Sequence, residues 1–177
     1  MCIRDREYQG ITLIENPYYA TCNNISSLYV ARDYLENAII LDGDQIIHNE
    51  RILTSEFCQS GYNSVWTSEE TDEWLQTVKD GIVTACSRVG GKCGWQLYSI
   101  SRWTAEDGRK LKKHLELEFE QRHHTQIYWD DIVMFCHPEE YQLGIFEMQA
   151  DDVIEIDSLD ELIDLDNSYE CFREKEE

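Results

Sequence analysis

Basic residues are scarce in this chain: 15 lysines and arginines stand against 36 aspartates and glutamates, which gives a formal net charge of −21 over 177 residues. A nucleic-acid groove or a surface for anionic lipids requires clustered positive charge, so this balance argues against both partners. Long apolar runs are also lacking, and no charged-then-apolar leader opens the sequence. We therefore expect small-molecule ligands, no nucleic acid and no membrane insertion.

Several chemical signatures are missing as well. The seven cysteines are odd in number, widely spread and without a Cys-x-x-Cys pair, which favours free thiols in the cytoplasm. No Gly-x-Ser-x-Gly elbow, Walker loop or Cys/His pair for nucleophilic catalysis occurs. His123-His124 and Cys136-His137-Pro138 lack the spacing of a zinc site, so we expect a solvated helix end and a turn there.

The most informative stretch runs from Ala38 to Ile47. An apolar run leads into Asp42-Gly43-Asp44, after which the chain is apolar again. This pattern predicts a buried strand that presents two carboxylates at its C-terminal end, where open α/β sheets bind ligands. Paired carboxylates are suited to a hard cation such as Mg²⁺, which would in turn hold a phosphate. The alternative is an ordinary acidic turn.

Asp157 occupies a similar junction. It follows a predicted strand over 153–156 and precedes Ser158-Leu-Asp-Glu161, which has the form of a helix capping box. Two such junctions on one sheet edge could share a metal ion, with Asp157 and Asp44 as ligands. Alternatively, Asp157 only complements the dipole of the following helix.

The remaining patterns predict alternating strands and helices. We expect strands over 9–15, 38–44, 62–66, 143–148 and 153–156, and an antiparallel hairpin that joins 82–89 to 95–101 through Gly90-Gly91. Helices are expected from Ser26 or Ser27 to residue 36, over 48–58, from Thr104 to residue 121, over 128–135 and from Ser158 onward. In the first of these helices Leu28, Ala31, Tyr34 and Leu35 share one face, and in the helix from Thr104 we expect Leu111, Leu115 and Phe119 to point inward. This order indicates an α/β fold.

Four aromatic residues lie beside acids or at element ends: Trp74, Trp103, Tyr128 and Trp129. An aromatic box flanked by carboxylates is how proteins hold a quaternary ammonium group, because ring faces attract a cation that cannot form hydrogen bonds. Packing in the core is the alternative for each ring.

Seven short landmarks follow one another over about residues 9–166: Asn16 with Tyr18, Asn23-Asn24-Ile-Ser-Ser27-Leu28, Asp42-Gly-Asp44, Glu73-Trp74, Gly94 with Ser101-Arg-Trp103, Tyr128-Trp129-Asp130 and Glu155-Ile-Asp157-Ser158. Together and in this order they resemble the bacterial CTP:phosphocholine cytidylyltransferases of the sugar-phosphate nucleotidyltransferase superfamily.

The resemblance implies a Rossmann-like, mixed and mostly parallel sheet flanked by helices. It implies that Asp44 and Asp157 hold Mg²⁺, with Asp42 beside them. It also implies a choline pocket, for which the matching candidates are Glu73, Trp74, Tyr128, Trp129 and Asp130. The implied reaction is attack of the phosphocholine phosphate on the α-phosphorus of CTP, with CDP-choline and pyrophosphate as products. Such a step needs positioning and charge neutralisation but no general base.

One part of the family pattern has no counterpart. Family members begin with a strand and a glycine-rich, basic loop that hold the nucleotide, and this sequence contains neither. We expect residues 1–6 to be a non-native leader, 7–170 to be the C-terminal majority of a nucleotidyltransferase domain, and 171–177 to be a frayed acidic tail. Impaired catalysis and an exposed apolar sheet edge would follow.

Two other functions fit the same residues. A glycosyltransferase that uses a nucleotide-sugar would employ Asp42 and Asp44 in the same way. A non-catalytic module would bind choline through Trp74 and Trp129 and release no pyrophosphate. The sequence also leaves phosphocholine and phosphoethanolamine open as acceptors.

Overall fold

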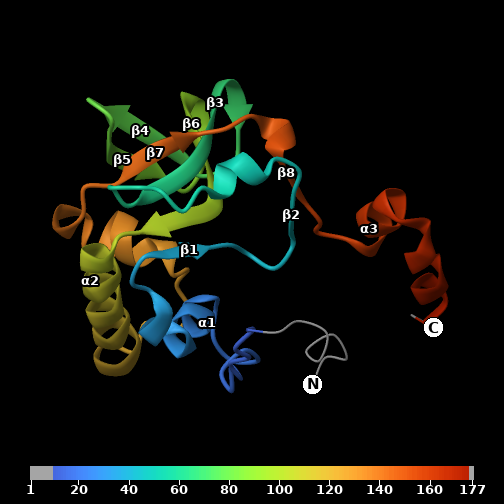
Figure 1. The fold of residues 1–177 in the computed structure, drawn as a ribbon, viewed down its shortest axis with the longest axis horizontal. Coiled ribbons are helices and arrows are strands. Elements are labelled where there is room, and N and C mark those ends of the chain that lie inside the picture. The colour runs from blue at the N-terminus through green and yellow to red at the C-terminus, as the bar shows by residue number, and fades with distance from the viewer. Residues whose placement is uncertain (1–9, 176–177) are drawn as a thin grey trace. The chain divides into compact units, whose positions relative to one another are not determined.

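The computed structural model describes residues 10–175, so the leader predicted over 1–6 lies outside the described residues. The chain forms two compact units (Figure 1). The helical unit comprises residues up to Ala38 together with Trp103–Tyr141, and the sheet unit comprises Ile39–Arg102 together with residues from Gln142 onward.

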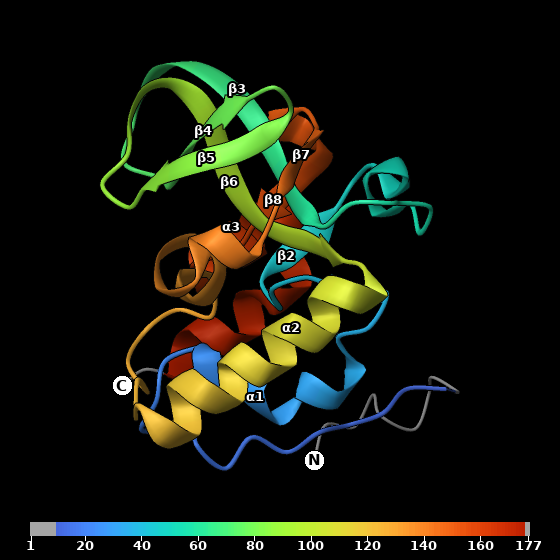
Figure 2. The same ribbon diagram turned by 90° about the vertical axis from the view of Figure 1, so that its left-hand side faces the viewer.

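The sheet unit contains a six-stranded sheet in which five strands have the order β5-β4-β6-β3-β7 (Figure 2). The sixth strand, β1, pairs with β6. The strands are β1 (Ala38–Ile40), β3 (Gly61–Thr71), β4 (Leu75–Lys79), β5 (Ile82–Ser87), β6 (Gly91–Trp103) and β7 (Gly144–Glu147). The mixed α/β class is therefore confirmed. The expectation of mostly parallel pairing is wrong for the described registers, because β6 runs antiparallel to β3 and β4, β4 runs antiparallel to β5, and only β7 runs parallel to β3.

The predicted hairpin between 82–89 and 95–101 is also wrong. Strand β4 lies between β5 and β6, and it connects to β5 through Asp80-Gly81. Both turn residues have positive φ, 52° and 80°, as a two-residue turn of type I′ requires. Asp-Gly is the strongest short hairpin signal, whereas Gly90 precedes β6 and Gly91 starts it.

The strand predicted over 9–15 does not form in residues 10–16, which are irregular. Ile11, Leu13 and Ile14 are 54%, 61% and 41% exposed. A strand is stable only when its backbone pairs with a neighbour, and no described strand pairs with this segment. The apolar side chains of this segment are therefore exposed without forming a strand.

A two-stranded ladder joins the middle of the chain to its late part. Strand β2 (Gln45–Ile47) pairs antiparallel with β8 (Val153–Glu155), and the predicted strand over 38–44 ends early, at Ile40. Asp42 and Asp44 consequently lie in the loop between β1 and β2. Short 3-10 turns, η3 (Glu50–Leu53) and η7 (Ala150–Asp152), flank the ladder, and Ile52, Ile100, Met148 and Val153 form the core beside it.

The last α-helix, α3 (Leu159–Leu165), begins where the sequence predicts. It starts at the capping box predicted for Ser158 and Glu161. The 3-10 helix η8 (Asn167–Lys175) follows, so the described part of the tail is helical instead of frayed. An ion pair of 2.6 Å between Arg173 and Asp160 holds it to α3.

The helical unit is built on α2 (Ala105–Glu116), which continues as the π-helical turn η4 (Leu117–Gln121). Thr104 caps it by accepting the Asp107 N–H, and Leu111, Leu115 and Phe119 face inward, all as predicted. Around it lie α1 (Ile25–Val30), η2 (Arg32–Tyr34), η5 (Ile132–Cys136) and η6 (Pro138–Glu140).

The first helix differs from its prediction. Asn24, and not Ser26 or Ser27, is the N-cap residue, and the α-helix ends at Val30 instead of residue 36. Tyr34, expected inward, is 60% exposed because the chain tightens into η2.

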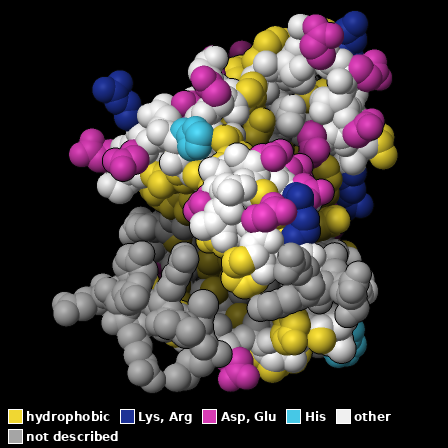
Figure 3. All heavy atoms as spheres, turned by 90° about the vertical axis from the view of Figure 1, so that its right-hand side faces the viewer, with side chains coloured by type: hydrophobic (Ala, Val, Ile, Leu, Met, Phe, Trp, Pro, Cys, Tyr) yellow, Lys and Arg dark blue, Asp and Glu magenta, His cyan; other side chains and the backbone are white. Residues whose placement is uncertain are grey.

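In the described residues no helix is long and apolar enough to cross a bilayer, and no described cysteine forms a disulfide. Acidic side chains are scattered over the described part of the face in Figure 3, in line with the net charge.

Candidate active site

The β2–β8 ladder brings two predicted metal ligands to the same end of one element. Gln45 pairs with Glu155, and the Ile156 N–H donates to the Asp44 carbonyl oxygen at 2.9 Å. Asp44 and Asp157 therefore lie next to this last rung, although 113 positions separate them in the sequence (157 − 44). The antiparallel register, and not a parallel sheet edge, is what makes them neighbours.

Asp157 is available for a ligand at this end. Its backbone N–H donates to Glu161 Oε2 at 2.8 Å, as part of the cap of α3, while its side chain is exposed and has no hydrogen bond to a described residue. The arrangement is compatible with both predictions for Asp157, metal binding and helix-dipole stabilisation.

Asp42 lies close enough to Asp44 and Glu155 for their negative charges to act on its carboxyl group. Burial raises the pKa of its carboxyl group, and the charges of Asp44 and Glu155 raise it further, although a hydrogen bond with Ser99 acts in the opposite direction. Burial and the charges of Glu155 and Glu73 likewise raise the pKa of Tyr98.

The carboxylates at this end of the ladder, those of Asp42, Asp44, Glu155 and Asp157, have the donor chemistry that a hard divalent cation prefers. Burial is the main cause of the raised pKa of Asp42, and a bound cation would offset the smaller contribution from the charges of Asp44 and Glu155. However, no three His, Cys, Asp or Glu side chains among the described residues are placed to hold a metal ion as they stand. The donor chemistry fits Mg²⁺, so its binding here is a proposal.

In the helical unit, three of the family landmarks are bonded to one another. Asn24 Oδ1 accepts the Trp129 N–H at 2.9 Å, and the Asn23 N–H donates to the Thr125 carbonyl at 2.8 Å. Asn16 Nδ2 donates to Ser27 Oγ at 3.1 Å. These contacts fix the segment around Asn23 and Asn24 to the loop that precedes Trp129.

The predicted aromatic box divides into buried and accessible rings. Trp103 and Trp129 are 0% and 2% exposed and contact each other edge to face, with centroids 6.0 Å apart. Core packing, the alternative interpretation, therefore describes these two rings. Tyr128 is 50% exposed, whereas Asp130 is buried.

Glu73 and Trp74 belong to the sheet unit. Trp74 is half-buried, and the Arg88 guanidinium lies 5.8 Å from the centre of its ring. The ring face thus contacts a cation, which is the property that a choline pocket requires.

The helical unit contains a buried polar cluster that was not predicted from the sequence. Glu118, whose side chain is 0% exposed, accepts hydrogen bonds of 2.7 Å from Arg122, His124 and His137. The predictions of a solvated helix end at His124 and of a turn at His137 are confirmed, because His124 is exposed and His137 joins η5 to η6, but the contacts of both rings with Glu118 were not predicted. A signal did exist: Glu118 follows Leu111 and Leu115 on the buried face of the helix, where a carboxylate needs partners.

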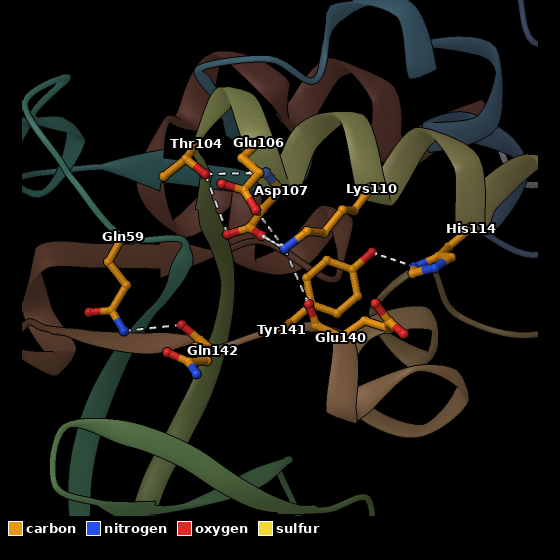
Figure 4. Close-up of polar contacts among 9 residues, drawn as sticks. All are labelled: Gln59, Thr104, Glu106, Asp107, Lys110, His114, Glu140, Tyr141 and Gln142. Carbon is orange, nitrogen blue, oxygen red and sulfur yellow. Dashed lines mark hydrogen bonds and ion pairs between the residues drawn. The ribbon is translucent and has the colours of Figure 1, made fainter.

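Two histidines extend this cluster. The His137 ring stacks on the His114 ring at 3.9 Å and 7°, and His114 Nδ1 lies 2.7 Å from the Tyr141 hydroxyl (Figure 4). Burial and the neighbouring His137 lower the pKa of His114, and burial raises the pKa of Tyr141. On the same helix, Lys110 Nζ lies 3.1 Å from Asp107 Oδ1, one turn earlier.

The fold itself defines the class. The chain superposes on a solved CTP:phosphocholine cytidylyltransferase from Streptococcus pneumoniae with a TM-score of 0.79 and 26% identity, which covers 92% of this chain and 71% of that one. An inositol-1-phosphate CTP transferase from T. maritima shares the fold at a TM-score of 0.55 and 13% identity, over 84% of this chain and 60% of that chain. This is the nucleotidyltransferase fold.

Sequence comparison gives the family. A 2-aminoethylphosphonate cytidylyltransferase from Lancefieldella rimae is 30% identical over 95% of this chain and 69% of its own length. Choline-phosphate cytidylyltransferases from Streptococcus pneumoniae and Haemophilus influenzae are 27% and 30% identical, over 87% and 85% of this chain and 66% and 64% of their own lengths. No family model matches the sequence. The chain belongs to the cytidylyltransferase family that contains these relatives.

Proposed function

We propose that this chain carries the acceptor and metal sites of a cytidylyltransferase that transfers CMP from CTP to phosphocholine. The observation that carries this proposal is the β2–β8 register, which brings Asp44 and Asp157 together beside Asp42 and Glu155. Family membership favours nucleotidyl transfer over the glycosyl transfer that the Asp-x-Asp pattern also allowed.

In the proposed reaction, a phosphate oxygen of phosphocholine attacks the α-phosphorus of CTP and pyrophosphate leaves. Asp44 and Asp157 would hold Mg²⁺, which neutralises phosphate charge when bound. Asp42 and Glu155 set the negative potential that favours the cation. No residue needs to take a proton, because the attacking phosphate oxygen is already ionised.

The acceptor headgroup would bind against Glu73 and Trp74. A trimethylammonium group offers no N–H donors, so an aromatic face and a nearby carboxylate suit it better than hydrogen-bond acceptors do. The guanidinium beside the Trp74 ring supports this assignment, because it shows a cation already at that face. A related acceptor, 2-aminoethylphosphonate, is the second candidate, since a relative of this chain is named for that substrate.

The metal site can be tested without turnover by titration with Mn²⁺, followed by its electron paramagnetic resonance signal. We expect Asp44→Asn and Asp157→Asn each to weaken Mn²⁺ binding at least tenfold. Asp151→Asn is the matched control, because Asp151 is exposed on η7, away from the Asp44 end of the ladder. Equal binding by all the variants would refute the metal site.

The acceptor can be identified by pyrophosphate release from CTP with phosphocholine, phosphoethanolamine or 2-aminoethylphosphonate. Trp74→Ala should weaken phosphocholine binding about tenfold, as the loss of one cation–π contact predicts. Trp66→Ala is the control, because Trp66 is 53% exposed on β3. Phosphocholine binding that is equally strong in Trp74→Ala and in the wild type would refute the acceptor site.

A further inference from the structure

A cavity of about 530 Å³ lies in the sheet unit. Its lining includes Asn49, Arg51, Asn63, Arg102 and Phe146. It adjoins the end of the β2–β8 ladder where Ile47 pairs with Val153, whereas Asp44 and Asp157 lie at the opposite end. The cavity is therefore distinct from the proposed metal site.

Arg102 is the notable residue of this cavity, because it is a cation that is only 1% exposed. Its guanidinium donates to Asn63 Oδ1 at 2.8 Å, to the Thr54 carbonyl at 3.4 Å and to the Ile52 carbonyl. Its Cζ atom lies 4.0 Å from the centre of the Phe146 ring. All of these partners are neutral.

The positive charge of Arg102 is consequently not matched by a negative one. No described acidic side chain forms an ion pair with it. Asp152, which also lines the cavity, is engaged elsewhere: its carboxylate accepts from Asn49 Nδ2 at 2.8 Å and from the Gln149 N–H at 2.9 Å. A buried charge without a counter-charge is costly, and burial lowers the pKa of Arg102 accordingly.

The guanidinium also has donors left over. It carries five N–H groups, and three acceptors use three of them, so two N–H groups have no partner among the described residues. Pairs of guanidinium N–H groups match the spacing of oxygens in phosphate and carboxylate groups. Arg51, exposed at the rim, adds a second positive charge.

We propose that this cavity binds an oxyanion of the phosphate type, held by the Arg102 guanidinium and attracted by Arg51. The alternative is that Arg102 only ties the 50–54 loop to β3 through Asn63. The two accounts differ in one respect: an anion site is saturable and discriminates between anions, whereas a structural tie responds only to ionic strength.

The test is equilibrium unfolding of the full chain during titration with inorganic phosphate, with chloride at equal ionic strength as the reference. Binding to the folded state alone stabilises it in a saturable way. We expect phosphate to do so and chloride not to. Arg102→Gln should weaken the fitted phosphate affinity at least tenfold, while Arg173→Gln, which removes an exposed charge from η8, should leave it unchanged. Equal affinity in Arg102→Gln and wild type would overturn the proposal.

A pair of rim variants covers the case in which Arg102→Gln does not fold. Arg51 and Glu147 both line the cavity and are exposed, so replacing them leaves the core intact. Arg51→Gln should weaken phosphate binding several-fold, and Glu147→Gln should strengthen it. The same direction of change in both variants, or no change in either, would refute the site.

The volume leaves room for more than a free phosphate ion, so the same titration is repeated with a nucleoside monophosphate. Tighter, Arg102-dependent binding of the nucleotide would assign the oxyanion to a larger molecule. Tighter binding of inorganic phosphate would assign it to the free ion. Neither outcome depends on cytidylyltransferase activity.

Discussion

Replacing Glu118 by Gln tests whether the buried carboxylate holds the helical unit together. The substitution keeps the size of the side chain but removes its charge and one acceptor oxygen. In the wild type, three cationic or protonatable groups converge on this carboxylate at 2.7 Å. The variant leaves them facing an amide.

The expected cost follows from how exposed each partner is. His137 is 12% exposed, and a hydrogen bond between a buried charge and such a partner contributes about 1.5–3 kcal/mol. Arg122 and His124 are 50% and 49% exposed, so solvent reduces their contributions to about 0.5 kcal/mol each. Because the amide oxygen retains one acceptor, we expect a net loss of about 2 kcal/mol, or about 4–8 °C in Tm.

The pH dependence of this loss supplies a second readout. Burial alone would raise the pKa of Glu118, but hydrogen bonds from His137 and His124 and the charge of Arg122 outweigh it and hold the pKa below its ordinary value of 4.5. The folded state therefore binds this proton more weakly than the unfolded state. The contribution of Glu118 to stability is present above about pH 4.5 and is lost as the pH falls through the lower folded pKa.

Urea unfolding of wild type and variant at pH 7 and at acidic pH measures both effects, and amide hydrogen exchange of His124 and Thr125 reports on the loop. Glu106→Gln is the control on the same helix, because Glu106 is 75% exposed and should change stability by less than about 0.5 kcal/mol. An unfolding free energy for Glu118→Gln within 0.5 kcal/mol of the wild type at pH 7 would show that the cluster adds nothing to stability.

Two further predictions concern the same unit. Gly108→Ala should lower the free energy of unfolding by about 2 kcal/mol, because a Cβ atom there would overlap the Leu35 carbonyl oxygen. This overpacking outweighs the gain in helix propensity. Gly43→Ala is the control in the same urea assay, because a Cβ atom at Gly43 meets nothing within 4 Å. His114→Gln should flatten the fall in stability on acidification: burial and His137 lower the pKa of His114, so its contribution is present above its ordinary value of 6.5 and is lost as the pH falls through the lower folded value. An unchanged acid slope would contradict this reasoning.

Local signals in the sequence were sufficient wherever one residue determines the structure. The cap at Thr104 and the capping box at Ser158 fixed the starts of α2 and α3, and the spacing of Leu111 and Leu115 fixed the buried face of α2. Such features depend on contacts within a few residues, which a sequence displays directly.

The pairing of strands was harder to predict from the sequence, because a register depends on residues that are far apart in the chain. The apolar alternation of 82–89 identified a strand, but the partner was β4 and not β6, since the Asp80-Gly81 turn closes the tighter hairpin. Likewise, the apolar content of 9–15 did not suffice for a strand, because strand formation also requires an edge to pair with.

The candidate site combines local features, which the sequence shows, with a long-range strand pairing, which the sequence does not show. The sequence placed Asp44 and Asp157 each at a strand boundary, which is a local property, but it proposed a shared sheet edge to unite them. The structure unites them through the antiparallel β2–β8 register, in which Ile156 bonds to Asp44 itself. The position of Asp157 relative to Asp44 therefore depends on three short rungs, those of Gln45, Ile46 and Ile47. A shift of one residue in the register of this ladder would turn its side chains to the opposite face. We therefore expect the proposed metal binding to be weakened more by changes that alter the β2–β8 register than by changes in the surroundings of Asp44 or Asp157.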